Sequence, residues 1–383
     1  MSNNDSQLKS VEIEKRNKLK QEKPYVYEKI MKYDEKIKRG ESVAILQFQY
    51  DYTCNFLCDH CCITKLRRKH GQSGCAPTDT TSTAIKQGER WFTPADVKEL
   101  CKQADEMGLA HIVITGGEPL VFPDFDKIVE AIDPQKFYIT SDTNGWFLDE
   151  KRAKHLKDIG VDKVQISLDS LSAAEHDNFR KHAGAYDKAI RAIDAAKSAC
   201  LNVLIQTVVT KQRVRSQEFD DFLKYLNNEK GVPVFITYAK PVGDWEGNYD
   251  AMVNKEDMDY VRALEKKYNV FTHLTPSYGV DFGCIAVKRM VSITKYGDVM
   301  PCPYIHVSLG NFFKEPLKDI FERGLNIKQF GQYYDSCYMA EDKDFVDKYI
   351  AGRVYGKPLP VPYNEVFTEE DFIKPSERKL YKD

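Results

Sequence analysis

The stretch VAILQFQYDYTCNFLCDHCC, residues 43–62, decides the fold of this 383-residue chain. Its first part, Val43 to Tyr50, is an apolar run with the composition of a β-strand. Its second part places Cys54, Cys58 and Cys61 on one loop at the spacing C-x3-C-x2-C. Three thiolates on one loop can hold three irons of a [4Fe-4S] cube, which leaves the fourth iron to bind a small molecule through an amino and a carboxylate group.

This spacing resembles the signature of the radical S-adenosylmethionine (SAM) superfamily. The resemblance implies that the small molecule is SAM, whose reductive cleavage gives a 5′-deoxyadenosyl radical that removes hydrogen from an unactivated carbon. His60 stands where the family usually has a carbocyclic aromatic residue, and Cys62 is a neighbouring thiol that could compete for iron. The alternative is a zinc site, although zinc normally takes four ligands arranged as two close pairs.

Composition and charge bound the class of protein. The chain has 56 lysines and arginines against 58 aspartates and glutamates, a formal charge of −2, so it shows no global electrostatic footprint for nucleic acid or an anionic membrane. No apolar run approaches the roughly 20 residues that span a bilayer. Ten cysteines at metal-like spacings, in a long chain without a secretory signal, favour the reducing cytoplasm over a disulfide framework.

Beyond the first stretch, β-rich runs alternate with helix-like stretches as far as Tyr238, which is the pattern of repeated βα units and a parallel sheet. Strands are predicted at residues 43–50, 111–115, 136–140, 163–168, 202–209 and 233–238. Helices are predicted near residues 94–107, 125–132, 149–159, 186–199 and 218–226. The predicted fold class is α/β, a partial (β/α)6 TIM-like barrel, with a closed eight-stranded barrel as the alternative. We expect the chemistry at the carboxyl ends of the strands.

Residues after the second and third predicted strands resemble SAM-binding motifs of the family. Gly116 and Gly117 let the backbone approach a ligand closely, and Glu118 presents an acceptor to an ammonium group. This segment is similar to the GGE motif, which holds the methionine amine of SAM. Asn144, within Thr-Asn-Gly, resembles the TNG segment of many relatives, although an Asn-Gly turn is a sufficient structural explanation.

The fourth predicted strand carries Ser167 near its end, and Arg180 lies eleven residues beyond Asp169. In the similar family pattern, a serine hydroxyl and a later arginine bind the SAM carboxylate. Arginine suits that task because it is permanently charged and donates a planar pair of hydrogen bonds. The alternative for Arg180 is an ion pair on a helix surface.

A second set of cysteines begins at Cys284 and continues as C-x12-G-x4-C through Gly297 and Cys302, with Cys337 further on. Glycine at a tight turn lets a hairpin fold back, which could place Cys284 and Cys302 near one point. The segment resembles the auxiliary-cluster domain called SPASM, or its shorter form, twitch. The resemblance implies one auxiliary [4Fe-4S] cluster with Cys284, Cys302 and Cys337 as ligands. Ordinary buried thiols are the alternative.

The fourth ligand of the auxiliary cluster stays open among the substrate, a distant group such as Cys75, Cys200 or an acidic residue, and water. Lys240 and Asp281 are substrate-side catalytic candidates, because a buried lysine or aspartate could deprotonate a substrate radical. A structural or solvated role is the alternative for both. The polar stretch at residues 63–90 contains four basic residues between 65 and 69 and is predicted to cover the barrel mouth, with a disordered loop as the alternative.

The predicted organisation has four parts. Residues 1–42 form an N-terminal helical extension, and residues 43–245 form the radical SAM core. Residues 246–350 form a small α+β domain of the twitch or SPASM type with a preceding helix. Residues 351–383 form an extended, proline-rich tail.

The resemblance implies an enzyme that oxidises, epimerises or rearranges a small metabolite, with a flavodoxin- or ferredoxin-type electron donor. The first alternative is a maturase of a ribosomally made peptide. From other classes come a non-catalytic iron-sulfur electron carrier and a zinc-stabilised binding protein. Glu118, Ser167 and Arg180 favour an enzyme, since neither a carrier nor a zinc module needs a clamp for an amino acid.

Overall fold

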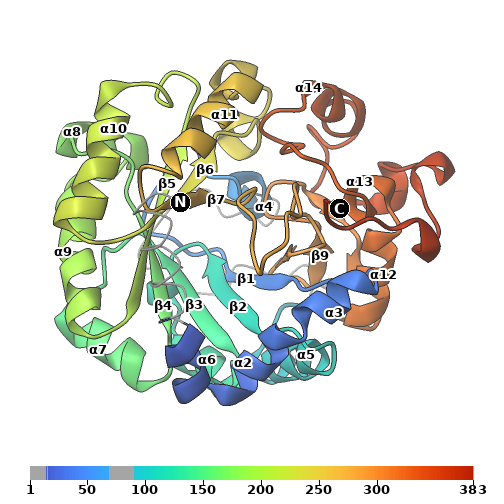
Figure 1. Cartoon of the computed structure of the whole chain (residues 1–383), viewed down its shortest axis with the longest axis horizontal. Coiled ribbons are helices and arrows are strands. Elements are labelled where there is room, and N and C mark those ends of the chain that lie inside the picture. The colour runs from blue at the N-terminus through green and yellow to red at the C-terminus, as the bar shows by residue number, and fades with distance from the viewer. Residues whose placement is uncertain (1–13, 15, 69–89, 383) are drawn as a thin grey trace.

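A computed structural model describes residues 14, 16–68 and 90–382 of the chain (Figure 1). The six predicted strands are present as a parallel sheet in chain order. They are β1 (Ile45–Asp51), β2 (His111–Gly116), β3 (Tyr138–Thr143), β4 (Lys163–Ser167), β5 (Asn202–Val209) and β6 (Val234–Tyr238). The predicted α/β class is therefore confirmed.

Two further parallel strands extend this sheet, and the sequence did not predict their place in it. β7 (Val270–Thr272) pairs with β6, and β8 (Met290–Ile293) pairs with β1. At three and four residues these strands are too short to show a clear alternation of apolar and polar side chains. The sheet order places β7 at one edge and β8 next to β1, so among the described residues the barrel stays open, as predicted.

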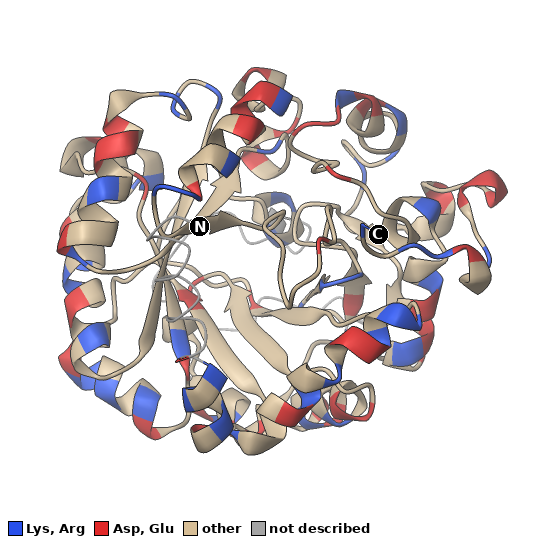
Figure 2. Ribbon diagram, viewed as in Figure 1, with Lys and Arg blue, Asp and Glu red and all other residues tan. Residues whose placement is uncertain are grey.

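Helices cover the outer face of the sheet (Figure 1). They are α5 (Pro94–Glu106), α6 (Phe125–Ile132), α7 (Glu150–Asp158), α8 (Ala173–Arg180), α9 (Ala185–Ser198) and α10 (Gln217–Lys224). α5 begins with a capping box between Thr93 and Asp96, which satisfies backbone N–H groups of its first turn. Val97, Leu100 and Ala104 then form one buried stripe on α5. Figure 2 shows the charged residues mainly on the helices, while the strands are largely uncharged.

The N-terminal arm contributes α2 (Pro24–Met31) and α3 (Tyr33–Lys38), which lie against the amino ends of the strands. The ammonium of Lys23 lies 2.5 Å from Asp162, just before β4, and donates to the carbonyl of Phe137, just before β3. Lys29 donates to the carbonyl of Leu109, before β2. The arm therefore covers the end of the barrel that faces away from the expected chemistry.

The second half of the chain continues the sheet at the β8 edge. β9 (Asp298–Met300) runs antiparallel to β8, as the predicted hairpin requires, and β11 (Gly310–Asn311) runs antiparallel to β9. A separate pair joins β10 (Val307–Ser308) to β12 (Val361–Pro362). The remaining helices are α4 (Thr64–Arg68), α11 (Lys255–Leu264), α12 (Leu317–Leu325), α13 (Lys328–Gly331) and α14 (Lys343–Phe345).

Short helical turns complete the fold: η1 (Pro119–Val121), η2 (Tyr225–Glu229), η3 (Gly243–Trp245), η4 (Tyr249–Ala251), η5 (Val346–Ala351), η6 (Tyr363–Glu365), η7 (Glu369–Asp371) and η8 (Pro375–Glu377). Within the described ranges, none of the helices combines the length and the apolar character needed to cross a bilayer.

Candidate iron-sulfur and SAM site

One cavity at the carboxyl ends of the strands collects the first predicted site. Its lining includes the three cysteines of the loop after β1 and all six predicted SAM-binding residues: Cys54, Cys58, Cys61, Gly116, Gly117, Glu118, Asn144, Ser167 and Arg180. These residues come from the ends of four strands and from α8. Residues that are up to 126 positions apart in the chain are thus brought to one place by the parallel sheet.

The cysteine loop and the glycines after β2 are in direct backbone contact. The N–H of Gly117 donates to the carbonyl of Asp51 at 2.8 Å, and the N–H of Glu118 donates to the carbonyl of Thr53 at 2.8 Å. A Cβ atom on Gly116 would lie 2.2 Å from the Asp51 oxygen, and one on Gly117 would lie 1.9 Å from the Thr53 oxygen. Only glycine therefore lets these two loops lie together.

Glu118 ties the end of β2 to the end of β3. Its carboxylate accepts from the hydroxyl of Thr143 and the backbone N–H of Asn144, both at 2.7 Å, and from the N–H of Leu120 at 3.2 Å. Burial raises the pKa of this carboxyl to about 7. Asn144 donates in turn to the side chain of Asn55, within the cysteine loop, at 2.8 Å. Glu118 and Asn144 thus each hold neighbouring loops in place, in addition to the contact with SAM that the sequence predicts.

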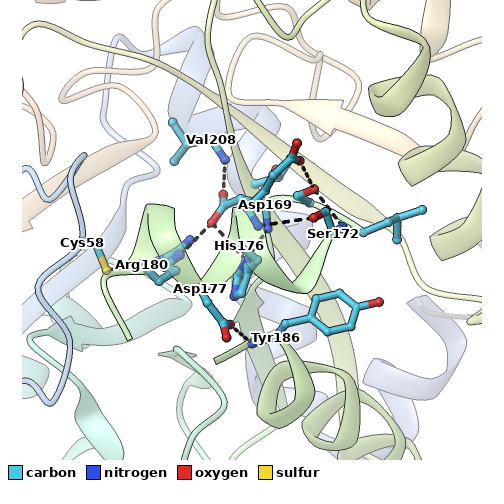
Figure 3. Close-up of polar contacts among 12 residues, drawn as sticks. Cys58, Asp169, Ser172, His176, Asp177, Arg180, Tyr186 and Val208 are labelled. Carbon is cyan, nitrogen blue, oxygen red and sulfur yellow. Dashed lines mark hydrogen bonds and ion pairs between the residues drawn. The ribbon is translucent and has the colours of Figure 1, made fainter. Parts of the chain in front are cut away.

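Arg180 lies beside the first cysteine set (Figure 3). Its Nε donates to Asp169 at 2.7 Å, and its Nη1 lies 3.9 Å from the sulfur of Cys58. Both partners of the ion pair are buried, so Arg180 is not in the surface pair considered as the alternative. Burial alone would raise the pKa of the Asp169 carboxyl, but the charge of Arg180 holds it well below its usual range.

Asp169 also connects this pair to the sheet and to α8, as Figure 3 shows. Its second oxygen accepts from the backbone N–H of Val208 at the end of β5, at 2.9 Å. Its own N–H donates to Nδ1 of His176 at 3.1 Å. The guanidinium next to Cys58 is therefore held by β4, β5 and α8 together.

The second cysteine set lies outside that cavity. Gly283 contacts the segment before Cys337, because a Cβ atom there would lie 1.9 Å from the carbonyl oxygen of Tyr334. The N–H of Cys284 donates to the same oxygen at 2.7 Å. Burial, with the Cys284 thiol acting in the same direction, raises the pKa of Cys302 and of Cys337 to about 12, so the three thiols lie near enough to influence one another's charge.

Lys240 lies between the cavity and the second cysteine set. Its side chain lines the cavity, donates to the carbonyl of Tyr238 at 2.8 Å and lies 4.0 Å from the centre of the Tyr304 ring. Burial lowers its pKa, whereas the thiols of Cys337, Cys302, Cys62 and Cys284 act in the opposite direction. Lys240 therefore remains a substrate-side candidate.

Asp281, the other substrate-side candidate, is placed elsewhere. Its carboxylate accepts from the N–H of Gly283 at 2.9 Å and from the hydroxyl of Tyr333 at 3.2 Å, and it does not line the cavity. These bonds organise the turn that leads to Cys284, so we keep no substrate-side role for Asp281.

The open questions about the auxiliary site and the polar stretch are answered in part. Cys200 is exposed and precedes β5, at the opposite end of the strands, which removes it as a fourth ligand. Cys75 lies outside the described residues, as does most of the polar stretch. Within the part that is described, Lys65 pairs with Glu246 at 2.5 Å and Arg67 lines the cavity.

Sequence reasoning missed the polar side chains on the inner face of the sheet. Gln47 and Gln49 of β1 and Asp142 of β3 line the cavity. Their signal in the sequence is the alternation of Gln47 and Gln49 with Leu46 and Phe48, which marks an inner polar face in a strand that is otherwise apolar. Asp142 carried no such signal, because the predicted strand ended at Thr140.

The donors fit iron-sulfur clusters better than a single metal ion. In the described part of the chain, no three His, Cys, Asp or Glu side chains gather closely enough to hold one ion. The ligands of a zinc ion share one bonding shell at about 2.3 Å for sulfur, whereas the thiolates of a cluster each bind a different iron. The three thiols of the first set line one cavity without gathering closely enough for one ion, which suits the second arrangement.

Comparisons with known proteins agree with this geometry. Residues 52–226 match the model of the radical SAM superfamily, and residues 284–343 match SPASM, an iron-sulfur cluster-binding domain. The AdoMet-dependent heme synthase of Nitratidesulfovibrio vulgaris is 23% identical over 315 residues, which cover 75% of this chain and 80% of the synthase. The mycofactocin maturase MftC of Mycobacterium tuberculosis is 26% identical over 299 residues, 73% of this chain and 71% of the maturase.

Among solved structures, Streptococcus suis SuiB bound to its precursor peptide SuiA has a similar fold. The TM-score is 0.55 at 17% sequence identity, and the match covers 76% of this chain and 68% of SuiB. At this identity the likeness concerns the fold alone.

Proposed function

Because the chain belongs to the radical SAM superfamily and carries a SPASM iron-sulfur domain, we propose that this enzyme is a maturase that modifies a residue within a peptide. When bound, the first [4Fe-4S] cluster and SAM supply a 5′-deoxyadenosyl radical that removes a hydrogen atom from the substrate. We further propose a cytoplasmic reaction and a flavodoxin- or ferredoxin-type electron donor.

The observation that carries the proposal is the character of the inner strand faces in the cavity that the first cysteine set lines. Apart from Asp142, the inner strand faces contribute neutral amides and hydroxyls, among them Gln47, Gln49 and Gln206. Of the other charged groups in the lining, the Glu118 carboxylate accepts from donors of β3 and Arg180 is paired with Asp169, which leaves Arg67 and Lys240 as the further cations. Neutral hydrogen-bonding groups suit peptide amides better than a substrate with many negative charges.

The comparisons support the same choice. MftC is named as a maturase and SuiB is seen with a precursor peptide, whereas the heme synthase shares a comparable part of the chain at slightly lower identity. The small-metabolite substrate expected from the sequence is therefore the second candidate.

Individual side chains have separable roles in this proposal. Ser167 and Arg180 bind the carboxylate of SAM, and Asp169 orients Arg180 for that contact. Gly116 and Gly117 keep the backbone beside the cysteine loop. Lys240 accepts a proton from the substrate at Nζ, where burial favours the neutral amine. The walls of the cavity exclude water from the radical.

The test uses anaerobically reconstituted enzyme with SAM and dithionite. Peptides encoded by short reading frames beside the gene form one set of substrates, and a small-molecule extract below about 1 kDa forms the other. We expect 5′-deoxyadenosine to increase, and one peptide to change mass, only with the peptide set. Cys58→Ala is the control that should lose both signals.

Stimulation by the small-molecule extract, with every peptide left unchanged, would overturn the peptide proposal in favour of the metabolite. Clusters without any SAM cleavage under either condition would contradict the catalytic reading altogether.

A further inference from the structure

A belt of polar side chains runs around the inside of the sheet below the SAM site. We define the polar belt as Gln47, Gln49, Thr115, Asp142, Gln206 and Thr237, all of which line the cavity. Gln49 stands opposite Thr115 in the register of β1 and β2, and Asp142 stands on the neighbouring strand β3. The belt therefore spans strands β1 to β3 and continues on β5 and β6.

Amide N–H groups of the polar belt donate hydrogen bonds to other residues of the chain. Gln49 donates through Nε2 to Ser292 at 2.8 Å, and Gln206 donates through Nε2 to Thr237 at 3.3 Å. Thr115 and Gln47 hydrogen-bond the Asp142 carboxyl. These contacts leave acceptors rather than donors to face a ligand.

Three buried acceptor atoms have no hydrogen-bond partner in the described part of the chain: Oε1 of Gln47, Oε1 of Gln49 and Oδ1 of Asp142. Buried polar atoms are rarely left unpaired, because each costs about 1–3 kcal/mol. Of these atoms, Oδ1 of Asp142 is the most certain acceptor, because both oxygens of a carboxylate accept hydrogen bonds. The oxygen and nitrogen of a glutamine amide can exchange places by a flip of the side chain. Three such acceptors line one cavity on β1 and β3, the two strands that flank β2, and they mark a place for a hydrogen-bond donor from outside the chain.

We propose that Asp142, supported by Gln47 and Gln49, binds a cationic nitrogen group of the substrate, an ammonium or a guanidinium. Such a group carries several N–H donors and a charge that offsets the buried carboxylate. Among the described residues, Lys163 is the cation that acts on Asp142, yet burial prevails and the pKa of Asp142 is raised to about 6. The carboxyl is therefore still mostly ionised at neutral pH and lacks a full counter-charge.

This inference rests on the proposed function, in which the group belongs to a lysine or arginine side chain, or to the amino terminus, of the peptide. The amino group of SAM has the same chemistry, so the experiment must separate the two sources. Asp319, exposed on α12 and far along the chain from the cavity, offers a matched control for an aspartate-to-asparagine change.

The test measures binding of small probes to reconstituted holoenzyme saturated with SAM, by saturation-transfer NMR. The probes are n-butylammonium, n-butylguanidinium, butyramide and butyrate. We expect the two cations to bind the wild type and Asp319→Asn equally, and to bind Asp142→Asn at least tenfold more weakly. Butyrate should bind none of them. Gln47→Met, which removes a neighbouring acceptor and the amide that hydrogen-bonds Asp142 but keeps the carboxylate, should give an intermediate loss and serves if Asp142→Asn folds poorly.

Equal cation binding by the wild type and Asp142→Asn, or a preference for butyrate, would overturn the inference. A tenfold loss of SAM affinity in Asp142→Asn would also overturn it, because Asp142 would then serve the SAM amine. Peptide modification without cation binding would remove this inference and leave the proposed function intact. Cation binding that depends on Asp142, without any peptide modification, would support the subsite and remove the peptide assignment.

Discussion

At the scale of single residues, Asp169 and Arg180 form a buried ion pair, so the loss of one partner should lower the stability of the fold. Asp169→Asn leaves the guanidinium of Arg180 buried without its counter-charge. We expect the free energy of unfolding to fall by about 3–5 kcal/mol, as is typical when one partner of a buried ion pair is removed. Urea denaturation of the wild type and the variant measures this difference.

The matched control is Asp34→Asn, which breaks the exposed pair between Asp34 and Lys38 on α3. It should change stability little, because exposed ion pairs are screened by water and salt. An equally small effect for Asp169→Asn would show that the Asp169–Arg180 pair is not held as the structure has it.

At the scale of elements, the contact between the cysteine loop and the loop after β2 depends on the absence of a side chain. Gly117→Ala would place a methyl group 1.9 Å from the carbonyl oxygen of Thr53, so the two loops must separate. We expect the first cluster to be lost and the auxiliary cluster to remain. Iron should fall from about eight to about four per chain, with SAM binding abolished, as iron assay and equilibrium dialysis would show.

Gly352→Ala is the control for that substitution, because its Cβ would meet nothing within 4 Å. It should keep the full iron content. A Gly117→Ala variant that also keeps about eight irons would mean that the two loops tolerate separation without loss of the cluster.

The elements also show what the sequence could and could not predict. Strong alternation of strands and helices made β1 to β6 predictable, and the prediction for Asn202–Val209 agrees with β5 at both ends. β3 was predicted two to three residues too early, which is why Asp142 was read as lying beyond the strand and its inward position was missed. The short strand β7 carries too few residues for any periodicity.

In the candidate site, the residues could be predicted from the sequence but their partners could not. Cysteine spacing and motifs after strand ends depend on local sequence, so they led to residues that do line one cavity. The partner of Arg180 and the bonds of Asp281 depend on contacts between distant segments, which spacing does not report.

At the scale of the whole molecule, the barrel and the auxiliary-cluster region share one sheet, because β8 pairs directly with β1. A chain that ends at Pro276 lacks β8, β9 and β11 and exposes the backbone edge of β1. We expect this truncated chain to aggregate, since an unpaired edge strand recruits other strands. Size-exclusion chromatography and far-UV circular dichroism of the truncated chain test this.

The control is the full chain with Cys284, Cys302 and Cys337 all changed to alanine, which keeps the pairing of β1 with β8 and should stay monodisperse. A truncated chain that elutes with the control and has a native spectrum would show that the barrel folds without β8.

Alternate residues of strand β1 have two different tasks, because one set packs in the core and the other faces the cavity. Leu46 and Phe48 are buried in the core, while Gln47 and Gln49 line the cavity. Substitutions at the second pair can therefore alter which molecules the barrel accepts while the core packing of the strand is unchanged. A one-residue insertion, by contrast, would turn the glutamines toward the core and the apolar side chains toward the cavity, which would disrupt both faces. Descendants of this chain can thus diversify their substrates by point substitution along β1, while its length is held constant.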